Sequence, residues 1–463
     1  MLNRLTGDPF VDAGYAVIKE LKRIFPDKKI IDLIDMVSDW FIYKWNGKID
    51  SLQLNSNITH NSKRGTQEKR QKAKQDVLAF FKKLLTCENS TDFESCRICG
   101  KHTKLFNAGR DIYPLSGSKA FVNFHHSHED GLLLCPDCIT KLFFLPLTVV
   151  HMGGKIALLH LQDQPTTDYW TNKVIKVNLN KLSRGESEGI LKSEFKNPKN
   201  ALFDMATDLI LNFDLEKRYL QLYYFTNFGS KPDCEFFTFP VPVFSYLNKV
   251  LKSCKTDWYL FLKRHYHLKK AKWDNEILEW KIKKEGKPIE PTEYKDNKNL
   301  VIEKLLDGQN LIPVFRKFYK EYFGYGKQIS LLLLDYYLKE VKQMDVKQLE
   351  IIKRLGNAIF EIAKNDDNNF KKYLTMIESA GKSYQLRGVL ITLIKKHYKT
   401  GNPQPLLTLE EYINYLFPDG VYWSEIRDVL IIYLYELLHK KSIKGVDVED
   451  IELKDIEEEL TEF

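Results

Sequence analysis

Apolar residues recur at helical spacing in the first part of the chain. From Ala13 they return every three or four positions until Pro26 ends the pattern, and a second amphipathic stretch runs from Ile30 to a stop near Gly47. The stretch before them, "LTGDPFVDAGY", is rich in turn residues, and we expect Asp12 to cap the first helix. Both helices should pack on a core.

The middle of the chain mixes helical and strand patterns. Residues 60–85 predict a loop that runs into a basic helix, and "KIALLHLQ" (155–162) predicts a strand. In "RYLQLYYFTNFGSKPDCEFFTFP", two roughly alternating aromatic runs flank Gly229 and Pro232, which predicts a hairpin. Residues 258–284 are expected to form a long basic helix with aromatic residues in it, followed by a linker, "EGKPIEPTEYKDNKN".

The last third of the chain is almost wholly helical in pattern. Thr408 and Glu411 match a capping box before "YINYLF". The predicted helices lie near 328–342, 346–364, 370–379, 383–399 and 423–440. A helix bundle is the natural interpretation.

These patterns predict an α+β protein with two domains. The first, residues 1–299, is a mixed N-terminal domain with an inserted four-cysteine, zinc-finger-like module at about 93–145. The second, residues 300–463, is a C-terminal helical bundle. A length of 463 residues and an apolar fraction of 43% are enough for cores of this size.

No apolar run approaches the roughly 18 residues of a membrane span, and the amino end has no secretory apolar segment. We therefore expect a cytoplasmic protein with no membrane partner. The net charge is +8, although Asp447–Phe463 holds nine acidic residues against one lysine, so the rest of the chain is more basic. That body would attract polyanions such as nucleic acid, and the acidic tail is expected to be disordered rather than a DNA mimic.

Four of the seven cysteines form two CxxC pairs, "CRIC" and "CPDC", with 35 residues between them. In a reducing compartment this spacing favours a metal site over disulfides, and four thiolates suit tetrahedral Zn²⁺. Such a closed site has no position for water, so its expected role is structural. The proposed ligands are Cys96, Cys99, Cys135 and Cys138, and the ordinary thiols are Cys87, Cys234 and Cys254.

The segment between the two pairs, "GRDIYPLSGSKAFVNFHHSHEDGLLL", is similar in outline to HNH endonucleases. Ile112 stands where their general-base histidine is expected, just before "YPLS". A metal-dependent nuclease would have to use other groups of the loop, namely His125, His126, His128, Glu129 and Asp130. The favoured interpretation is a loop that faces solvent or contacts phosphate.

Two basic stretches are candidates for nucleic-acid contact, the second with aromatic residues that suit a single strand. The alternative is that each is the solvated face of a helix whose aromatic residues are buried. The first stretch includes Lys63, Arg64, Lys69, Arg70, Lys72 and Lys74. The second includes Lys263, Arg264, Lys269 and Lys270, with Trp258, Tyr259, Tyr266 and Trp273 among them.

Several segments together resemble the CXXC-CXXC family of CRISPR-associated proteins, the large subunit of the type I-B Cascade effector. They are the start "TGDPFVDAG", the CRIC and CPDC pairs, the "YYFTNFG" hairpin and the end "LFPDGVYWSEIRDVLIIYLYELL". The likeness covers nearly the whole chain. It implies zinc at the four paired cysteines.

The resemblance implies a non-enzymatic role in RNA-guided antiviral defence in a prokaryote. The partners would be the other Cascade subunits and the CRISPR RNA. In that family the large subunit recognises the protospacer-adjacent motif in double-stranded DNA, promotes R-loop formation, helps hold the displaced single strand and presents the complex to a helicase-nuclease. Guide pairing reads the rest of the target, a division described for another effector class.

Three points stay open from sequence. The loops at Asn55–Gly65 and Gly109–Asp130 carry residue types that can enter a DNA groove, but no signature marks the motif readers. Met344 could open a separate 120-residue small subunit, as related type I systems make one by internal initiation. A scaffold stabilised by zinc, without nucleic-acid contact, is a further alternative.

Overall fold

The computed structural model describes residues 5–45, 52–53, 56, 58, 65–88, 90–91, 93–116, 131–213, 217–227, 233–324, 330–363, 367–418 and 423–440. The chain divides into two compact units, Met1–Val241 and Pro242–Phe463. The first mixes helices with a sheet and the second is mainly helical, which confirms the α+β prediction. The units meet between Val241 and Pro242, whereas the sequence places the boundary after Asn299. Residues 242–299 therefore belong to the helical unit.

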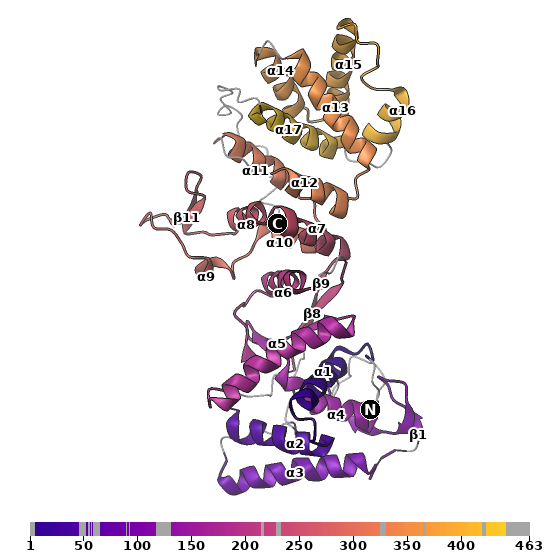
Figure 1. Ribbon diagram of the computed structural model, residues 1–463, viewed down its shortest axis with the longest axis vertical. Helices are drawn as coiled ribbons and strands as arrows, with labels where there is room; N and C mark the ends of the chain where they lie inside the picture. The colour runs from indigo at the N-terminus through magenta and orange to yellow at the C-terminus, as the bar shows by residue number, and fades with distance from the viewer. Residues whose placement is uncertain are drawn as a thin grey trace. The chain divides into compact units, whose positions relative to one another are not determined.

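The elements of the first unit are drawn in Figure 1. In chain order they are α1 (Pro9–Ile24), α2 (Ile30–Asp39), the π-helical turn η1 (Trp40–Lys44), α3 (Gln67–Leu85), β1 (Phe93–Ser95), β2 (His102–Lys104), β3 (Phe106–Ala108), β4 (Leu132–Leu134), α4 (Pro136–Phe144), the 3₁₀ turn η3 (Leu145–Leu147), β5 (Val150–Met152), β6 (Lys155–Leu161), α5 (Gln164–Ser183), β7 (Leu191–Lys192), α6 (Pro198–Asn212), β8 (Leu220–Thr226) and β9 (Asp233–Phe239).

The sheet of this unit has the order β7-β5-β6-β8-β9, and every neighbouring pair except β5–β7 is antiparallel. The expected strand at 155–162 and the expected hairpin are confirmed as β6 and as β8–β9. Side chains alternate between the two faces of a strand, so α1 and α6 cover opposite faces. Phe10 of α1 packs on Tyr223 and Phe225, whereas Phe203 of α6 packs on Phe239.

Helix α1 begins where a short polar side chain and a proline favour a helix start. Asp8 is the N-cap and accepts hydrogen bonds from the backbone N–H groups of Phe10 and Val11, with Pro9 in the first turn. The expectation that Asp12 caps the helix is wrong. Asp12 is buried and instead fixes the turn before the helix, accepting from the backbone N–H groups of Thr6 and Gly7.

The predicted basic helix is α3, which lies beside α2 (Figure 1). One of its cations is used inside the unit, because Lys74 Nζ lies 2.9 Å from a carboxylate oxygen of both Asp35 and Asp39 on α2. Val77 and Phe81 of α3 belong to the core. The basic stretch therefore serves packing as well as charge.

Helices α1 and α4 approach so closely that their backbones touch. A Cβ atom on Gly14 of α1 would lie 2.0 Å from the carbonyl oxygen of Lys141 on α4. The side chain of Lys141 is buried, and its Nζ lies 4.7 Å from the ring centroid of Tyr15. Only glycine permits this spacing.

The second unit is built around α11 and α17. Its elements in chain order are α7 (Val241–Ser253), α8 (Lys255–Arg264), β10 (Ala271–Asp274), β11 (Glu279–Ile282), α9 (Pro291–Tyr294), α10 (Leu300–Leu306), α11 (Ile312–Gly324), α12 (Leu332–Tyr336), the π-helical turn η4 (Tyr337–Val341), α13 (Val346–Ile362), α14 (Asp367–Glu378), α15 (Ser383–Lys399), α16 (Leu409–Glu411), the π-helical turn η5 (Tyr412–Leu416) and α17 (Trp423–Lys440). The predicted helices and the Thr408–Glu411 capping box are confirmed.

The prediction of one long helix over 258–284 is wrong. Helix α8 ends at Arg264, and the chain then forms the β10–β11 hairpin. Alternation of lysine with Ala271 and Trp273 has the period of a strand, and Asp274 accepts backbone hydrogen bonds from Glu276 and Ile277 in a turn. The expected linker also folds onto this unit, because Tyr294 and Asn299 are buried.

Replacing Gly14 by alanine should destabilise the first unit by roughly 2 kcal/mol or more, because the added methyl group overlaps a backbone atom that cannot rotate away. Thermal and urea unfolding of the full chain would measure the loss. The matched control is Gly388→Ala in α15, where a Cβ meets nothing within 4 Å and better helix propensity should leave stability unchanged or slightly higher. Equal stability of the two variants would contradict the close approach.

Candidate metal centre

Four cysteines from two separate segments meet in the first unit. Their Sγ atoms all lie within 4.8 Å of one another, with 3.9 Å between Cys96 and Cys138 and 3.6 Å between Cys99 and Cys135. Cys99 is half-buried and the other three are buried. The four sulfurs are placed to hold one metal ion, as the paired spacing predicts.

The first pair lies in a tight turn between β1 and β2. Strand Phe93–Ser95 pairs with His102–Lys104, and the turn is closed by a backbone hydrogen bond from Cys96 to Lys101 and one from Gly100 to Cys96. Gly100 has a φ of 70°, a conformation that glycine adopts without strain. The turn directs both thiols to the same side.

The second pair lies where a strand leads into a helix. Strand β4 pairs with β3, Cys135 is the N-cap of α4, and Cys138 stands in the first turn. The backbone N–H of Cys135 donates to Cys96 Sγ at 3.4 Å. A helix N-terminus carries partial positive charge, which favours thiolates at this position.

The electrostatics of the cluster favour a bound cation. Hydrogen bonding with Cys135 and Cys138 lowers the pKa of Cys96. Neighbouring sulfurs and burial raise the pKa of Cys138, and that of Cys135 rises to about 12. Four neighbouring thiolates repel one another, and a bound divalent ion would supply the positive charge that stabilises them.

A second polar cluster joins the amino-terminal turn to the segment that follows the first cysteine pair. The hydroxyl of Tyr113 donates to Asp8 Oδ2 at 2.5 Å. Burial is the largest cause that raises the pKa of Asp8, from 3.8 to about 6. Burial also raises the pKa of Tyr113, so the phenol remains a donor.

Asn227, at the end of β8, ties the same segment to the sheet. Its Oδ1 accepts from Arg110 Nε at 3.2 Å and from the backbone of Leu115 at 3.3 Å, and its Nδ2 donates to the carbonyl of Leu52 at 2.9 Å. The guanidinium of Arg110 also donates to the Asn227 carbonyl. Asn227 is fully buried, and its bonds to Arg110 and Leu52 are sheltered from water.

The candidate nuclease residues lie outside the described residues: His125, His126, His128, Glu129 and Asp130. The position before Tyr113, Ile112, is buried and its carbonyl accepts from Gln53 Nε2 at 2.8 Å. The loops considered for groove contact, at 55–65 and 109–130, are mostly undescribed as well. Of the second loop, the structure describes residues 109–116, which form hydrogen bonds with Gln53 and Asn227 of the first unit.

The predicted nucleic-acid residues are divided between the two units, and two of them lie outside the described residues. Lys63 and Arg64 lie outside the described residues, and Lys69 and Arg70 stand in the first turn of α3. In the second unit Lys263 pairs with Glu279. Arg264 pairs with Glu321, and Lys269 and Lys270 are exposed. Of the aromatic residues expected to stack on bases, Trp258 and Trp273 are buried.

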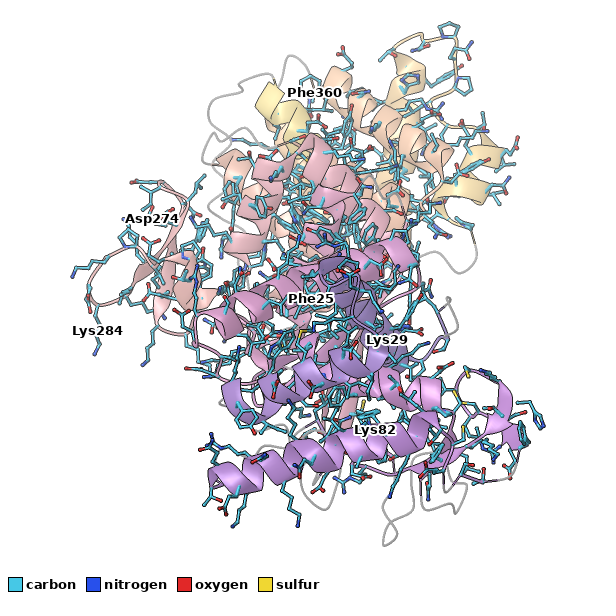
Figure 2. The ribbon with its side chains drawn as sticks, turned by 60° about the horizontal axis from the view of Figure 1, so that its bottom comes forward. Phe25, Lys29, Lys82, Asp274, Lys284 and Phe360 are labelled. Carbon is cyan, nitrogen blue, oxygen red and sulfur yellow. The ribbon has the colours of Figure 1, made fainter. Side chains whose placement is uncertain are left out.

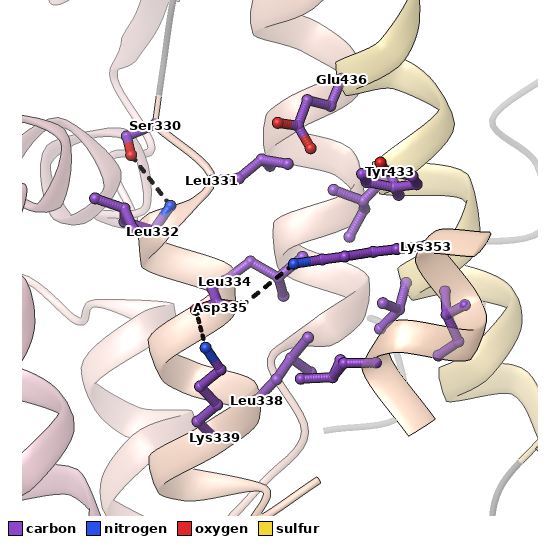
Figure 3. A pocket seen from close by; sticks show the side chains of 14 residues that line it. Ser330, Leu331, Leu332, Leu334, Asp335, Leu338, Lys339, Lys353, Tyr433 and Glu436 are labelled. Atoms are coloured by element: carbon purple, nitrogen blue, oxygen red, sulfur yellow. Dashed lines mark hydrogen bonds and ion pairs between the residues drawn. The ribbon is translucent and has the colours of Figure 1, made fainter. Parts of the chain in front are cut away.

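A groove of about 340 Å³ lies within the second unit, among residues of α12, η4, α13 and α17 (Figure 3). Its lining is largely apolar, with Leu334 and Ile352 among the contributing side chains. The carboxylate of Asp335 is paired with both Lys339 and Lys353. None of the described lining residues is a histidine or a cysteine.

Comparison with protein-family models and with curated proteins finds no match to this chain. Among the described residues, no helix is both long enough and apolar enough to cross a lipid bilayer. The four cysteines were evident from the sequence, whereas Asp8, Tyr113, Arg110 and Asn227 were missed. The sequence drew attention to these residues only indirectly. Each lies in a segment that was noted for another reason: "TGDP", "GRDIYPLS" or "YYFTNFG".

Replacing Cys99 by alanine should lower the bound metal from about one ion per chain to near zero, and should lower the melting temperature, because the ion links two turns distant in sequence. Elemental analysis of the purified chain identifies the ion and counts it. The control is Cys234→Ala, which removes a half-buried thiol outside the cluster and should keep the ion. Unchanged metal content in the Cys99 variant would rule out a four-cysteine site.

Asp8→Asn should change how stability depends on pH. With its pKa raised, Asp8 contributes stability that is fully present below about pH 4 and is lost as the pH rises through about 6. Asparagine keeps the cap without the charge, so relative to the wild type its stability should rise by roughly 2 kcal/mol between pH 4 and pH 7. Urea unfolding at both pH values measures this, and a constant difference would contradict it.

Proposed function

We propose that this protein is the non-catalytic large subunit of an RNA-guided type I-B CRISPR surveillance complex. In this role it recognises the protospacer-adjacent motif in duplex DNA, promotes R-loop formation and helps recruit the helicase-nuclease. The supporting observation is that separate segments of the resemblance converge in one unit. Asp8 of "TGDP" bonds Tyr113 between the cysteine pairs, and Asn227 of "YYFTNFG" bonds Arg110 and Leu115 of the same stretch.

Zinc is the proposed ion at the cysteine cluster. Four thiolates about 2.3 Å from a shared tetrahedral zinc lie about 3.8 Å from one another. The separations of 3.9 Å between Cys96 and Cys138 and of 3.6 Å between Cys99 and Cys135 fall on either side of that value. With all four positions taken by protein sulfur, the ion would stabilise the fold and would have no site for water or substrate.

Two features favour a binding subunit over an HNH-like nuclease that uses the loop 125–130. The position for the general base holds a buried isoleucine, Ile112, and the proposed zinc is closed. The body of the chain carries a positive net charge, which suits a partner of DNA and guide RNA in the cytoplasm. A scaffold without nucleic-acid contact would leave that charge without a role.

A separate product from Met344 remains part of the proposal. Such a product would contain α13 to α17 but not α11, which packs on α17. Arg316 of α11 also pairs with the buried carboxylate of Asp428 at 2.8 Å. The fragment would therefore need another surface to cover the exposed face of α17, and a multi-subunit complex offers one.

Expressing the tagged chain with its neighbouring genes and recovering the complex tests the proposal. We expect bound RNA of uniform length, a set of partner subunits and, if Met344 initiates, a 120-residue product that Met344→Leu abolishes. Gel shifts with duplexes that differ only beside the guide-matched segment should show binding that collapses when that motif changes. A chain that purifies alone and nicks DNA with added metal would overturn the proposal in favour of the nuclease.

A further inference from the structure

The β10–β11 hairpin of the second unit has two chemically different faces. Trp273 and Trp280 lie opposite each other in the register, are each 7% exposed and meet edge to face at 5.3 Å. The guanidinium of Arg264 lies 5.5 Å and 5.9 Å from their ring centroids and pairs with Glu321 on α11. This face anchors the hairpin to α8 and α11.

The other face carries two pairs of lysines, followed toward the turn by an acidic pair, Asp274 opposite Glu279. Lys272 and Lys281 stand directly opposite each other. One step beyond the strand ends, the backbone N–H of Lys283 donates to the carbonyl of Lys270, which places these two as the next pair on the same face. Lys269 and Lys284 flank them and are exposed, and in Figure 2 the side chain of Lys284 extends away from the ribbon.

These cations are largely uncompensated within the described part of the chain. Lys281 is neutralised by Asp274 at 2.7 Å. Lys270, Lys272 and Lys283 are exposed, and among the described residues no carboxylate lies within ion-pair distance of them. Lys270 and Lys283 stand opposite each other without a carboxylate partner among the described residues, so an anion against this face would relieve their repulsion.

We infer that the lysine face of β10–β11 binds the phosphate backbone of double-stranded nucleic acid. Lysines on alternate positions of a strand recur about every 6.6 Å, which gives a regular row of cations against a regular row of phosphates. A two-stranded ribbon also fits the major groove of a duplex. The inference rests on the proposed function in naming target DNA as the duplex, but affinity for a duplex is a property of the chain that can be measured without partners.

The same face argues against the other anionic partners. Single-strand sites use exposed aromatic side chains for stacking, and here Trp273 and Trp280 are buried on the opposite face. An acidic peptide, including the acidic tail of this chain, would be expected to need apolar anchors in pockets for a specific dock, and the paired positions on this face carry only charged side chains. A duplex needs neither feature.

The test compares two triple variants of equal net charge. The hairpin variant is Lys270→Gln, Lys272→Gln and Lys283→Gln. The control is Lys372→Gln, Lys395→Gln and Lys399→Gln, which removes three exposed lysines of α14 and α15. Both sets are on the surface, so melting temperatures should match the wild type.

Fluorescence anisotropy with a labelled duplex of about 30 base pairs and arbitrary sequence, measured over a series of salt concentrations, gives the result. The hairpin variant should bind at least ten-fold more weakly in about 0.1 M salt, and the slope of log K against log salt should fall by roughly 2 to 3, since each lost phosphate contact removes nearly one unit. The control should match the wild type. Equal binding by the two variants would overturn the inference.

Two further probes separate the remaining outcomes. If the hairpin variant binds the duplex as well as the wild type but loses affinity for single-stranded DNA or for polyglutamate, the duplex assignment is overturned and those molecules become the candidate partners. If the hairpin variant loses duplex affinity but no RNA-containing complex is ever recovered, the inference stands and the proposed function fails. If the complex forms and reads its motif equally well with either triple variant, the proposed function stands and the inference fails.

Discussion

The convergence of four sulfur atoms is the constraint on which the first unit depends. Strands β1 to β4 have three residues each, too few to hold a sheet by themselves in water. Their positions follow from the meeting of Cys96 and Cys99 with Cys135 and Cys138. Because Cys135 begins α4, the cluster also determines where α4 enters the core.

From α4 the packing spreads outward through aromatic side chains. Phe143 lies 5.5 Å from Phe41 and 5.0 Å from Phe81, measured between ring centroids, so one residue joins η1 and α3 to the helix that starts at the cluster. The thiols themselves belong to the same buried cluster as these rings. A small cysteine cluster can thus organise a core that is much larger than itself.

The sequence predicted those features that depend on local spacing. The two CxxC pairs, the helices from 346 onward and the β8–β9 hairpin all have patterns that a short window contains. The prediction for 258–284 was wrong. Its lysines were interpreted as the solvated face of a helix, although their alternation with Ala271 and Trp273 belongs to a strand. The roles of Asp8 and Asn227 were out of reach, since their partners at Tyr113 and Arg110 are over a hundred positions away.

The contact between Gly14 and Lys141 joins the two halves of the amino-terminal unit without an intervening side chain. Side chains relax by changing rotamer, whereas two backbones in contact move together or separate. Any displacement of α4 that follows from the state of its thiols is therefore passed to α1 and to the turn that Asp8 and Asp12 hold. The cysteine cluster and the amino-terminal turn are thus connected through backbone packing, at the point where Gly14 meets Lys141.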